Sequence, residues 1–401
     1  MSVVVGGGGA APAGFVTAGV AAGIKRTGAL DLAILASTTP ATAAGLFTTN
    51  LATAAPVLVS REHLEATGGR ARAIVVNSGC ANACTGPAGM QVARLMCAET
   101  ARALECEAEE VLVASTGVIG VQLDPRTVSA GIIDAAHQLD AAHHAAAARA
   151  IMTTDPFPKD HAVRADLPGG AVTIGGMAKR SGMIEPNLAT MLAFLTTDAA
   201  VDARMLRQAL ADACDDTFNA ITVDGESSTN DSVFLLANGA GGVRVGPADY
   251  HRFVDALREV CLELALGIVR GGEGATKLVT VRVTGGATDA CARKAARAIA
   301  NSPLVKTAIH GGDPNWGRLI AVAGRSGAHF DLAGARVEVG GVVLFEQGRP
   351  FDERAPQAAA HLQQKDVSVL VDLGTGGPHE ARIFTCDFSA EYVRINAEYR
   401  T

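Results

Sequence analysis

Short runs of apolar and β-branched residues recur along the chain, and most of them are followed by Gly, Asn or Ser. Such runs, bounded by turn-forming residues, indicate buried strands. Between them, apolar residues repeat with a helical period, and this alternation predicts an α/β chain. The predicted strands are residues 73–76, 111–113, 172–174, 233–236, 279–283, 337–343 and 367–373, and the predicted helices are residues 88–104, 202–213, 249–267 and 291–300.

Two segments stand out from this alternation. Residues 141–150 are rich in Ala, a composition that predicts a surface or packing helix without chemistry. Gly271, Gly272 and Gly274 separate a helical pattern from the strand at 279–283, so we expect either a domain hinge or a site loop there. With 401 residues, the chain is long enough for two or three domains.

Composition and charge narrow the classes of partner. Apolar residues make up 48% of the chain and charged residues 19%, which predicts a globular protein. The net charge of −7 and the lack of a basic run exclude nucleic acid and anionic membranes as expected partners. Apolar stretches such as 191–195 are far shorter than the ~20 residues that span a bilayer. Residues 1–13 lack a signal-peptide pattern, so we expect a cytoplasmic protein.

The cysteines are expected to be free thiols rather than disulfides, because the chain has cytosolic character. The sequence has no Cys-x-x-Cys or His-Glu-x-x-His pattern, so we expect no metal. Residues 219–231 lack the acidic spacing of a calcium loop. The glycine groups at residues 6–9 and 271–274 are not phosphate loops, because no Gly-Lys-Ser/Thr follows either of them. The cysteines are Cys80, Cys84, Cys97, Cys106, Cys214, Cys261, Cys291 and Cys386.

The segment 175–192 changes abruptly from polar, turn-prone residues to an apolar run, with Thr190 at the junction and the small Ala189 before it. A Thr hydroxyl there could attack the carbonyl just upstream, and hydrolysis of the resulting ester would leave Thr190 as a new N-terminus. Its α-amine, with an ordinary pKa of about 7.7–8.0, could then act as base to its own hydroxyl. Threonine is also common at the start of ordinary strands, and this segment alone favours that simpler interpretation.

Two further segments place Gly-containing turns after predicted strands. In residues 113–120, backbone N–H groups at the turn, together with a neighbouring hydroxyl, could form an oxyanion hole, although a simple turn explains the pattern as well. Residues 77–86 contain two asparagines and two glycines, which is typical either of Asx turns and helix capping or of a site.

Eight ordered segments, taken together, resemble the glutamate N-acetyltransferase/ornithine acetyltransferase family of arginine biosynthesis. They extend over essentially the whole chain, so their joint signal is far more specific than any one of them, and it reverses the interpretation of Thr190. The segments are residues 25–50, 77–79, 115–120, 152–155, 177–192, 221–231, 313–318 and 392–401.

The resemblance implies a layered α/β sandwich of the N-terminal-nucleophile type with a smaller C-terminal α/β domain. Residues 1–189 would form an α chain after self-cleavage, and residues 190–277 would begin a β chain that completes the catalytic domain. Residues 278–401 would form the smaller domain, with a tail that returns to the active site. The family also implies an assembly of two α and two β chains and no cofactor.

The family's functional residues match positions in this sequence. Thr190 matches the nucleophile released by cleavage after Ala189, and Thr116 and Gly117 match the oxyanion-hole pair. The residue types suit an amino-acid substrate, because Lys179 can hold a carboxylate and Glu273 an ammonium group. Thr153 is preferred over Thr154 as a ligand. The implied substrate-binding residues are Thr153, Lys179, Thr190, Glu273, Asn396 and Thr401.

The implied activity moves an acetyl group from N2-acetylornithine to glutamate by a ping-pong mechanism through acetyl-Thr190. Whether acetyl-CoA also serves as donor is left open. A related hydrolase or aminopeptidase would pass the acyl group to water, and a silent binding protein is disfavoured by the intact catalytic positions. A paralogue of specialised metabolism would use another amine acceptor. Four residues depart from the family pattern, and these departures concern which amine accepts the acetyl group. They are Cys80, Arg180, Glu185 and Glu226.

Overall fold

The computed structural model describes residues 1–185 and 191–398, and within them the strands form two sheets. The nine-stranded sheet runs in the order β1 (Ser2–Val3), β6 (Lys159–Leu167), β7 (Gly170–Lys179), β8 (Leu192–Thr197), β9 (Ser232–Ala237), β3 (Leu32–Phe47), β4 (Arg70–Cys80) and β5 (Val111–Val118), with β2 (Phe15–Val20) paired to β3. The six-stranded sheet runs in the order β13 (Arg349–Pro350), β12 (Val342–Glu346), β11 (Arg336–Val339), β14 (Asp366–Asp372), β10 (Leu278–Gly286) and β15 (His379–Cys386).

Helices alternate with these strands, which confirms the predicted α/β class. No helix in the described residues is both long and apolar enough to cross a membrane. The eight cysteines are free thiols, five of them buried, and Cys84 is exposed. The helices are α1 (Ala55–Ala66), α2 (Gly86–Leu104), α3 (Pro125–His137), α4 (His144–Ala150), α5 (Ala203–Asp215), α6 (Tyr250–Arg270), α7 (Asp289–Ala300), α8 (Pro303–Gly311), α9 (Trp316–Arg325), α10 (Ala355–Leu362) and α11 (Ala390–Glu398).

Strand β3 carries the nine-stranded sheet from one layer to the next. Its first part, residues 32–37, pairs with β2, whereas residues 42–47 pair with β9. Between these parts the register with β4 shifts, in a stretch that contains Pro40, and proline cannot donate to a strand ladder. The two halves of the sheet therefore pack face to face, through a buried cluster that includes Leu35, Ile74, Phe194 and Phe234.

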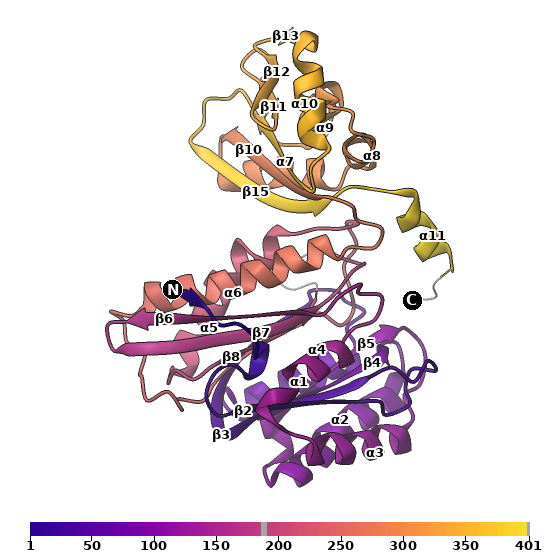
Figure 1. The fold of residues 1–401 in the computed structure, drawn as a ribbon, viewed down its shortest axis with the longest axis vertical. Helices are drawn as coiled ribbons and strands as arrows, with labels where there is room; N and C mark the ends of the chain where they lie inside the picture. The colour runs from indigo at the N-terminus through magenta and orange to yellow at the C-terminus, as the bar shows by residue number, and fades with distance from the viewer. Residues whose placement is uncertain (186–190, 399–401) are drawn as a thin grey trace.

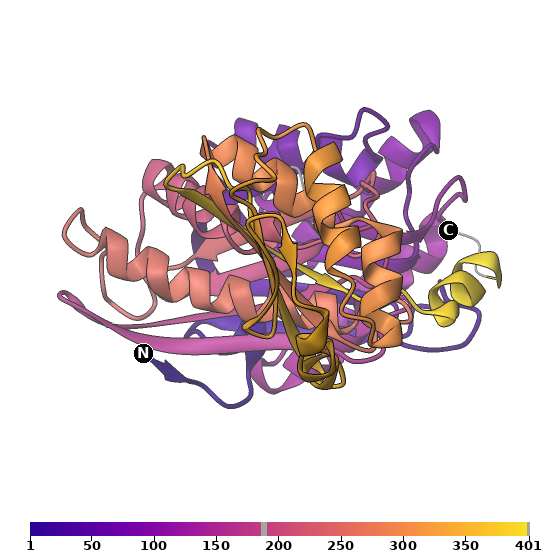
Figure 2. The ribbon, with the colours of Figure 1, turned by 90° about the horizontal axis from the view of Figure 1, so that it is seen from above.

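Helices cover both outer faces of this folded sheet. Helices α5 and α6 share a core with β6–β9, and α1–α3 share another with β2–β5. Figure 1 shows the resulting layers, with α6 above β6–β8 and with α2 and α3 below β4 and β5. The six-stranded sheet has its own core with α7 and α9. Viewed from above in Figure 2, α11 lies apart from that sheet, to one side.

One predicted strand is wrong in extent. The run at 337–343 is two strands, β11 and β12, joined by a hairpin. Gly340 and Gly341 both have positive φ, at 59° and 78°, which is the backbone that a two-residue hairpin turn of matching twist requires. The apolar pattern continues through the turn, so it concealed the break.

Helix α4 leads directly into the site, and a glycine sets its position. Gly19 of β2 lies so close to α4 that a Cβ there would be 2.3 Å from the Ala146 carbonyl oxygen. The close approach fixes the end of α4, from which the chain continues to Thr153 and Asp155.

Replacing Gly19 by Ala is expected to lower the free energy of unfolding by about 1–3 kcal/mol, because backbone rather than a flexible side chain must move. Gly311→Ala is the control, since a Cβ at that helical position meets nothing within 4 Å. Urea unfolding of both variants measures the difference. Equal stability of Gly19→Ala and the parent protein would show that α4 shifts without cost.

Candidate active site

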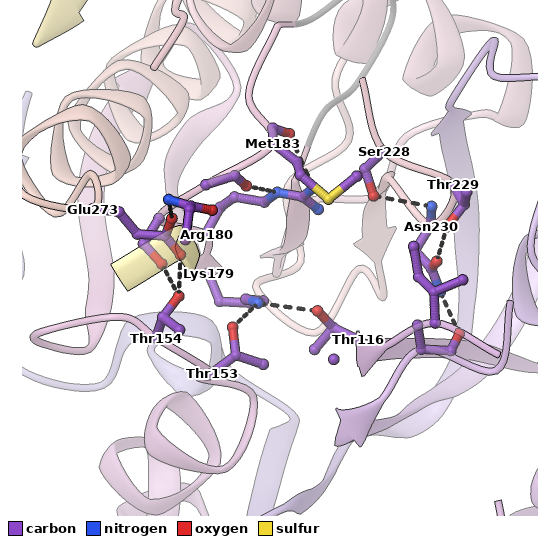
Figure 3. Close-up of a pocket in the computed structure, with 16 residues that line it drawn as sticks. Thr116, Thr153, Thr154, Lys179, Arg180, Met183, Ser228, Thr229, Asn230 and Glu273 are labelled. Carbon is purple, nitrogen blue, oxygen red and sulfur yellow. Dashed lines mark hydrogen bonds between the residues drawn. The ribbon is translucent and has the colours of Figure 1, made fainter. Parts of the chain in front are cut away.

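A pocket opens at the carboxyl ends of β5 and β7 and just ahead of β9 (Figure 3). Its walls come from segments that are far apart in sequence, including the loop after α6 and helix α11. The pocket contains the candidate site residues Thr116, Gly117, Thr153, Lys179, Glu273 and Asn396, together with Ala81, Ile119, Thr154, Arg180, Ser181, Gly182, Met183, Ser228, Thr229 and Asn230.

Lys179, the last residue of β7, is a buried cation that lines this pocket. Its Nζ donates hydrogen bonds to Thr153 Oγ1 at 2.7 Å and to Thr116 Oγ1 at 3.0 Å, as Figure 3 shows. Burial lowers the pKa of Lys179 to about 8, although the Asp155 carboxylate opposes this shift. Lys179 therefore stays largely protonated at neutral pH and can attract a carboxylate.

Asp155 balances the buried positive charge. Its Oδ1 accepts from Lys159 Nζ at 2.6 Å and from the Arg180 backbone N–H at 2.8 Å, while Oδ2 lies 3.9 Å from Lys179 Nζ. Burial pushes the pKa of Asp155 upward, but the Lys179 and Lys159 ammonium groups outweigh burial and hold that pKa at about 2. The negative charge of one carboxylate thus lies beside two buried lysines and offsets part of their positive charge.

The predicted oxyanion-hole residues lie at the end of β5. Because Thr116 Oγ1 accepts from Lys179, its own hydrogen is available to donate into the pocket. Gly117 has φ of 128°, and a Cβ there would lie 2.4 Å from the Gly79 carbonyl carbon. The pairing of β4 with β5 shifts register beside this contact, at Cys80. Only glycine fits at position 117, and it lets β4 approach the turn.

Glu273 is the acid of the pocket and is held from two sides. Its Oε1 accepts from Thr154 Oγ1 at 2.9 Å, and its Oε2 accepts from Asn396 Nδ2 at 2.8 Å. Because the Thr154 hydroxyl donates its hydrogen to Glu273, the Ser181 hydroxyl is the donor in its contact with Thr154 Oγ1, at 2.5 Å. A Cβ on Gly182 would lie 2.6 Å from Glu273 Oε2, so a glycine there makes room for the carboxylate.

The glycine loop that carries Glu273 is fixed by the six-stranded sheet. Asp387, just after β15, accepts from the backbone N–H groups of Thr276 at 2.7 Å and Lys277 at 2.9 Å, and from His310 Nδ1 at 2.6 Å. The Thr276 hydroxyl also donates to Asp387, at 2.6 Å. Burial tends to raise the pKa of Asp387, but the Thr276 hydroxyl and the other hydrogen bonds lower that pKa overall. The loop predicted as either hinge or site loop is thus part of the pocket and also leads into β10.

Helix α11 reaches the pocket through polar contacts, and none of its described residues is buried. Tyr392 donates to Asp224 Oδ2 at 3.2 Å, and Asn396 donates to Glu273. Ser389, just before the helix, donates to the Gly274 carbonyl at 2.6 Å. These contacts hold the C-terminal segment at the rim of the pocket.

Three predicted site positions, Ala189, Thr190 and Thr401, lie outside the described residues. Thr153 Oγ1 accepts from Lys179 Nζ and Thr154 Oγ1 donates to Glu273, so both threonines line the pocket. The preference for Thr153 as the ligand stays a prediction. Sequence reasoning missed Asp155, although the Met-Thr-Thr-Asp segment contains it. It also missed Asn230, which donates to the carbonyl groups of Ala81 and Ser115 behind the pocket.

The family model that matches this chain is that of the ArgJ family, over residues 16–401. The chain belongs to the ArgJ family. The arginine biosynthesis bifunctional protein ArgJ of Symbiobacterium thermophilum is 53% identical over 402 residues, which cover 98% of this chain and 99% of that protein. The resemblance inferred from eight sequence segments is therefore confirmed.

Solved chains of ArgJ proteins are also similar to it. The arginine biosynthesis bifunctional protein of Bacillus halodurans is 41% identical with a TM-score of 0.49, and the match covers 51% of this chain and 97% of that one. The ornithine acetyltransferase of Mycobacterium tuberculosis, solved with ornithine, is 46% identical with a TM-score of 0.44, and the match covers 47% of this chain and 98% of that one.

We predict that Asp155→Asn lowers the pKa of Lys179 below about 8, because the Asp155 charge raises that pKa. The pH above which Lys179 of this ArgJ-family chain loses its positive charge should move downward. The ε-carbon signal of 13C-labelled lysine, assigned by its loss in Lys179→Arg, reports this titration. Asp166→Asn, at an exposed position of β6, is the matched control, and an unchanged midpoint in Asp155→Asn would contradict the assigned coupling.

Proposed function

We propose that this chain is an acetyltransferase that moves the acetyl group of N2-acetylornithine to glutamate through an acetyl-Thr190 intermediate. We further propose that it first cleaves itself between Ala189 and Thr190, and that two copies of each fragment assemble. The name of the Symbiobacterium thermophilum relative, which assigns that protein to arginine biosynthesis, supports this proposal.

The observation that carries the proposal is the opposite charge of two groups in one pocket. Lys179 and Glu273 both line it, each with its own set of hydroxyl or amide partners. An amino acid with a free carboxylate and a side-chain ammonium group, as in N2-acetylornithine, fits a cation and an anion placed in this way. A pocket for an uncharged amide would not need to bury Lys179 and Asp155 together.

The self-cleavage requires no group beyond the chain and water. The Thr190 hydroxyl attacks the Ala189 carbonyl, the acyl group moves from nitrogen to oxygen, and the nitrogen takes up the hydroxyl proton. Water then hydrolyses the ester, which leaves a carboxylate on Ala189 and a free α-amine on Thr190. That amine can accept the hydroxyl proton in later steps.

In the transfer reaction, Thr190 Oγ attacks the acetyl carbonyl of N2-acetylornithine. The oxyanion that forms would accept a hydrogen bond from the Thr116 hydroxyl. The departing nitrogen takes up the proton that Thr190 gave up, and ornithine leaves as the amine. The amine of glutamate then attacks acetyl-Thr190, and Thr190 regains its proton. Preorganised donors of this kind lower the barrier because they act on charge that develops in the transition state.

Two assay tubes, with and without glutamate, separate this activity from its alternatives. Transfer yields N-acetylglutamate only when glutamate is present, whereas a hydrolase releases acetate in both tubes. Replacement of glutamate by other amines tests for a different acceptor, and replacement of N2-acetylornithine by acetyl-CoA tests for a second donor.

Thr190→Ala is expected to leave one band near 40.8 kDa and no transfer activity, because the variant has neither the hydroxyl nor a new amine. A denaturing gel and intact mass measure the splitting. Thr280→Ala, on β10 in the other sheet, is the control and should split normally. If Thr190→Ala still splits into two fragments between residues 189 and 190, that result would contradict the assigned nucleophile.

Glu273→Gln should slow acetylation by N2-acetylornithine by roughly 10- to 100-fold, since a charged hydrogen bond contributes about 1.5–3 kcal/mol. Discharge by glutamate should change less, because glutamate has no side-chain ammonium group. Burst kinetics followed by discharge separate these half-reactions, with Glu263→Gln at an exposed position of α6 as the control. Equal loss in both half-reactions would instead make Glu273 a structural acid of the glycine loop.

A further inference from the structure

The segment that leads toward the proposed cleavage point contains a residue in an unusual conformation. Met183 has φ of 56°, in the left-handed region that residues other than glycine rarely adopt. Such a conformation persists only where the surroundings impose it, and it is found most often at functional sites. Met183 lies between two side chains of opposite charge, Arg180 and Asp224. Both form hydrogen bonds with the backbone of residues 182–184.

Arg180 binds the carbonyl groups of this segment. Its Nε donates to the Gly182 carbonyl at 2.7 Å, and its Nη2 donates to the Met183 carbonyl at 2.9 Å. The third nitrogen, Nη1, donates to Asp231 Oδ1 at 2.8 Å. Both side chains of this ion pair are buried, so the guanidinium group is held in one place at the entry to β9.

Asp224 binds the N–H groups of the same segment. Its Oδ2 accepts from the Met183 N–H and its Oδ1 from the Ile184 N–H, both at 2.7 Å. The loop that carries Asp224 is fixed in turn by helix α8, because Lys306 Nζ donates to the Val223 carbonyl at 2.8 Å. Lys306 Nζ also donates to Thr385 Oγ1 of β15 at 2.8 Å, which connects this contact to the six-stranded sheet. Cation and anion thus bind opposite polar groups of one short stretch of backbone.

We propose that Arg180 and Asp224 form a backbone clamp on residues 182–184, and that both are positioning residues for the self-cleavage. The clamp acts through the chain that continues from Ile184 toward Ala189, because it fixes the direction in which that chain leaves the pocket wall. This inference rests on the self-cleavage proposed above. Neither side chain is assigned any contact with the reacting bond.

The test follows self-cleavage in time, by cell-free translation with a short radioactive pulse and a denaturing gel. Arg180→Met removes the two donors to the carbonyl groups, and Asp224→Asn leaves one side-chain carbonyl oxygen in place of two carboxylate oxygens. Both variants should split at least ten-fold more slowly than the parent chain. Arg94→Ala is the control, because Arg94 forms an exposed ion pair with Glu62 and should split at the parental rate.

The double variant Arg180→Met, Asp231→Asn distinguishes the proposed clamp from a role of Arg180 in stability alone. A single Arg180→Met leaves a buried aspartate without its partner and lowers stability for that reason alone, whereas the double variant removes both charges. Its melting temperature should recover relative to the single variant, while its cleavage should stay slow because the carbonyl groups still lack donors.

Each outcome decides the matter. Slow cleavage in the double variant with a recovered melting temperature supports the clamp, and cleavage at the parental rate overturns it. If Arg180→Met does not fold, Asp224→Asn carries the same test, and parental splitting there also overturns the clamp. A parent chain that never splits overturns the proposed self-cleavage itself, which is a different result from equal splitting of parent and variants.

Discussion

The buried carboxylate of Asp155 is the interaction on which the rest of the site depends. Two lysines, Lys159 and Lys179, are buried beside it, and without its charge neither would have this opposite charge to offset the cost of burying a cation. Asp155 also binds the Arg180 N–H, so it fixes the backbone at the end of β7. Charge balance and backbone geometry in the pocket therefore have the same origin.

The pocket is assembled from most of the chain, and each sheet contributes. The nine-stranded sheet supplies Thr116 and Lys179 at strand ends, where backbone hydrogen bonding holds the positions firmly. The six-stranded sheet supplies no lining strand, yet through Asp387 it fixes the loop that carries Glu273. We infer that this sheet sets the geometry of the acidic side of the pocket and does not supply its chemical groups. Substitutions that destabilise the core of this sheet would therefore displace Glu273 by moving the loop.

Local pattern predicted the α/β class and five of the eleven helices in the described residues, because those depend on periodicity or composition within a few turns. These helices are α2, α4, α5, α6 and α7. It could not show that residues 337–343 bend back at Gly340, since apolar residues continue through the turn. Family motifs led to Thr116, Lys179 and Glu273, which line one pocket. Motifs did not show Asp155 as the partner of Lys179, nor the split of Thr153 and Thr154 between two charged groups, because such pairings form only when distant strands are packed.

The strand order of the nine-stranded sheet has a consequence for a chain cut between residues 189 and 190. Strands β8 and β9 follow the cut in sequence, but they lie between β7 and β3, which precede it. The two products would be interleaved, with each flank of the inserted pair bonded to the other piece. Neither could leave without breaking two full ladders of backbone hydrogen bonds, so the cut would change the connectivity of the polypeptide while the sheet held both pieces as one folding unit.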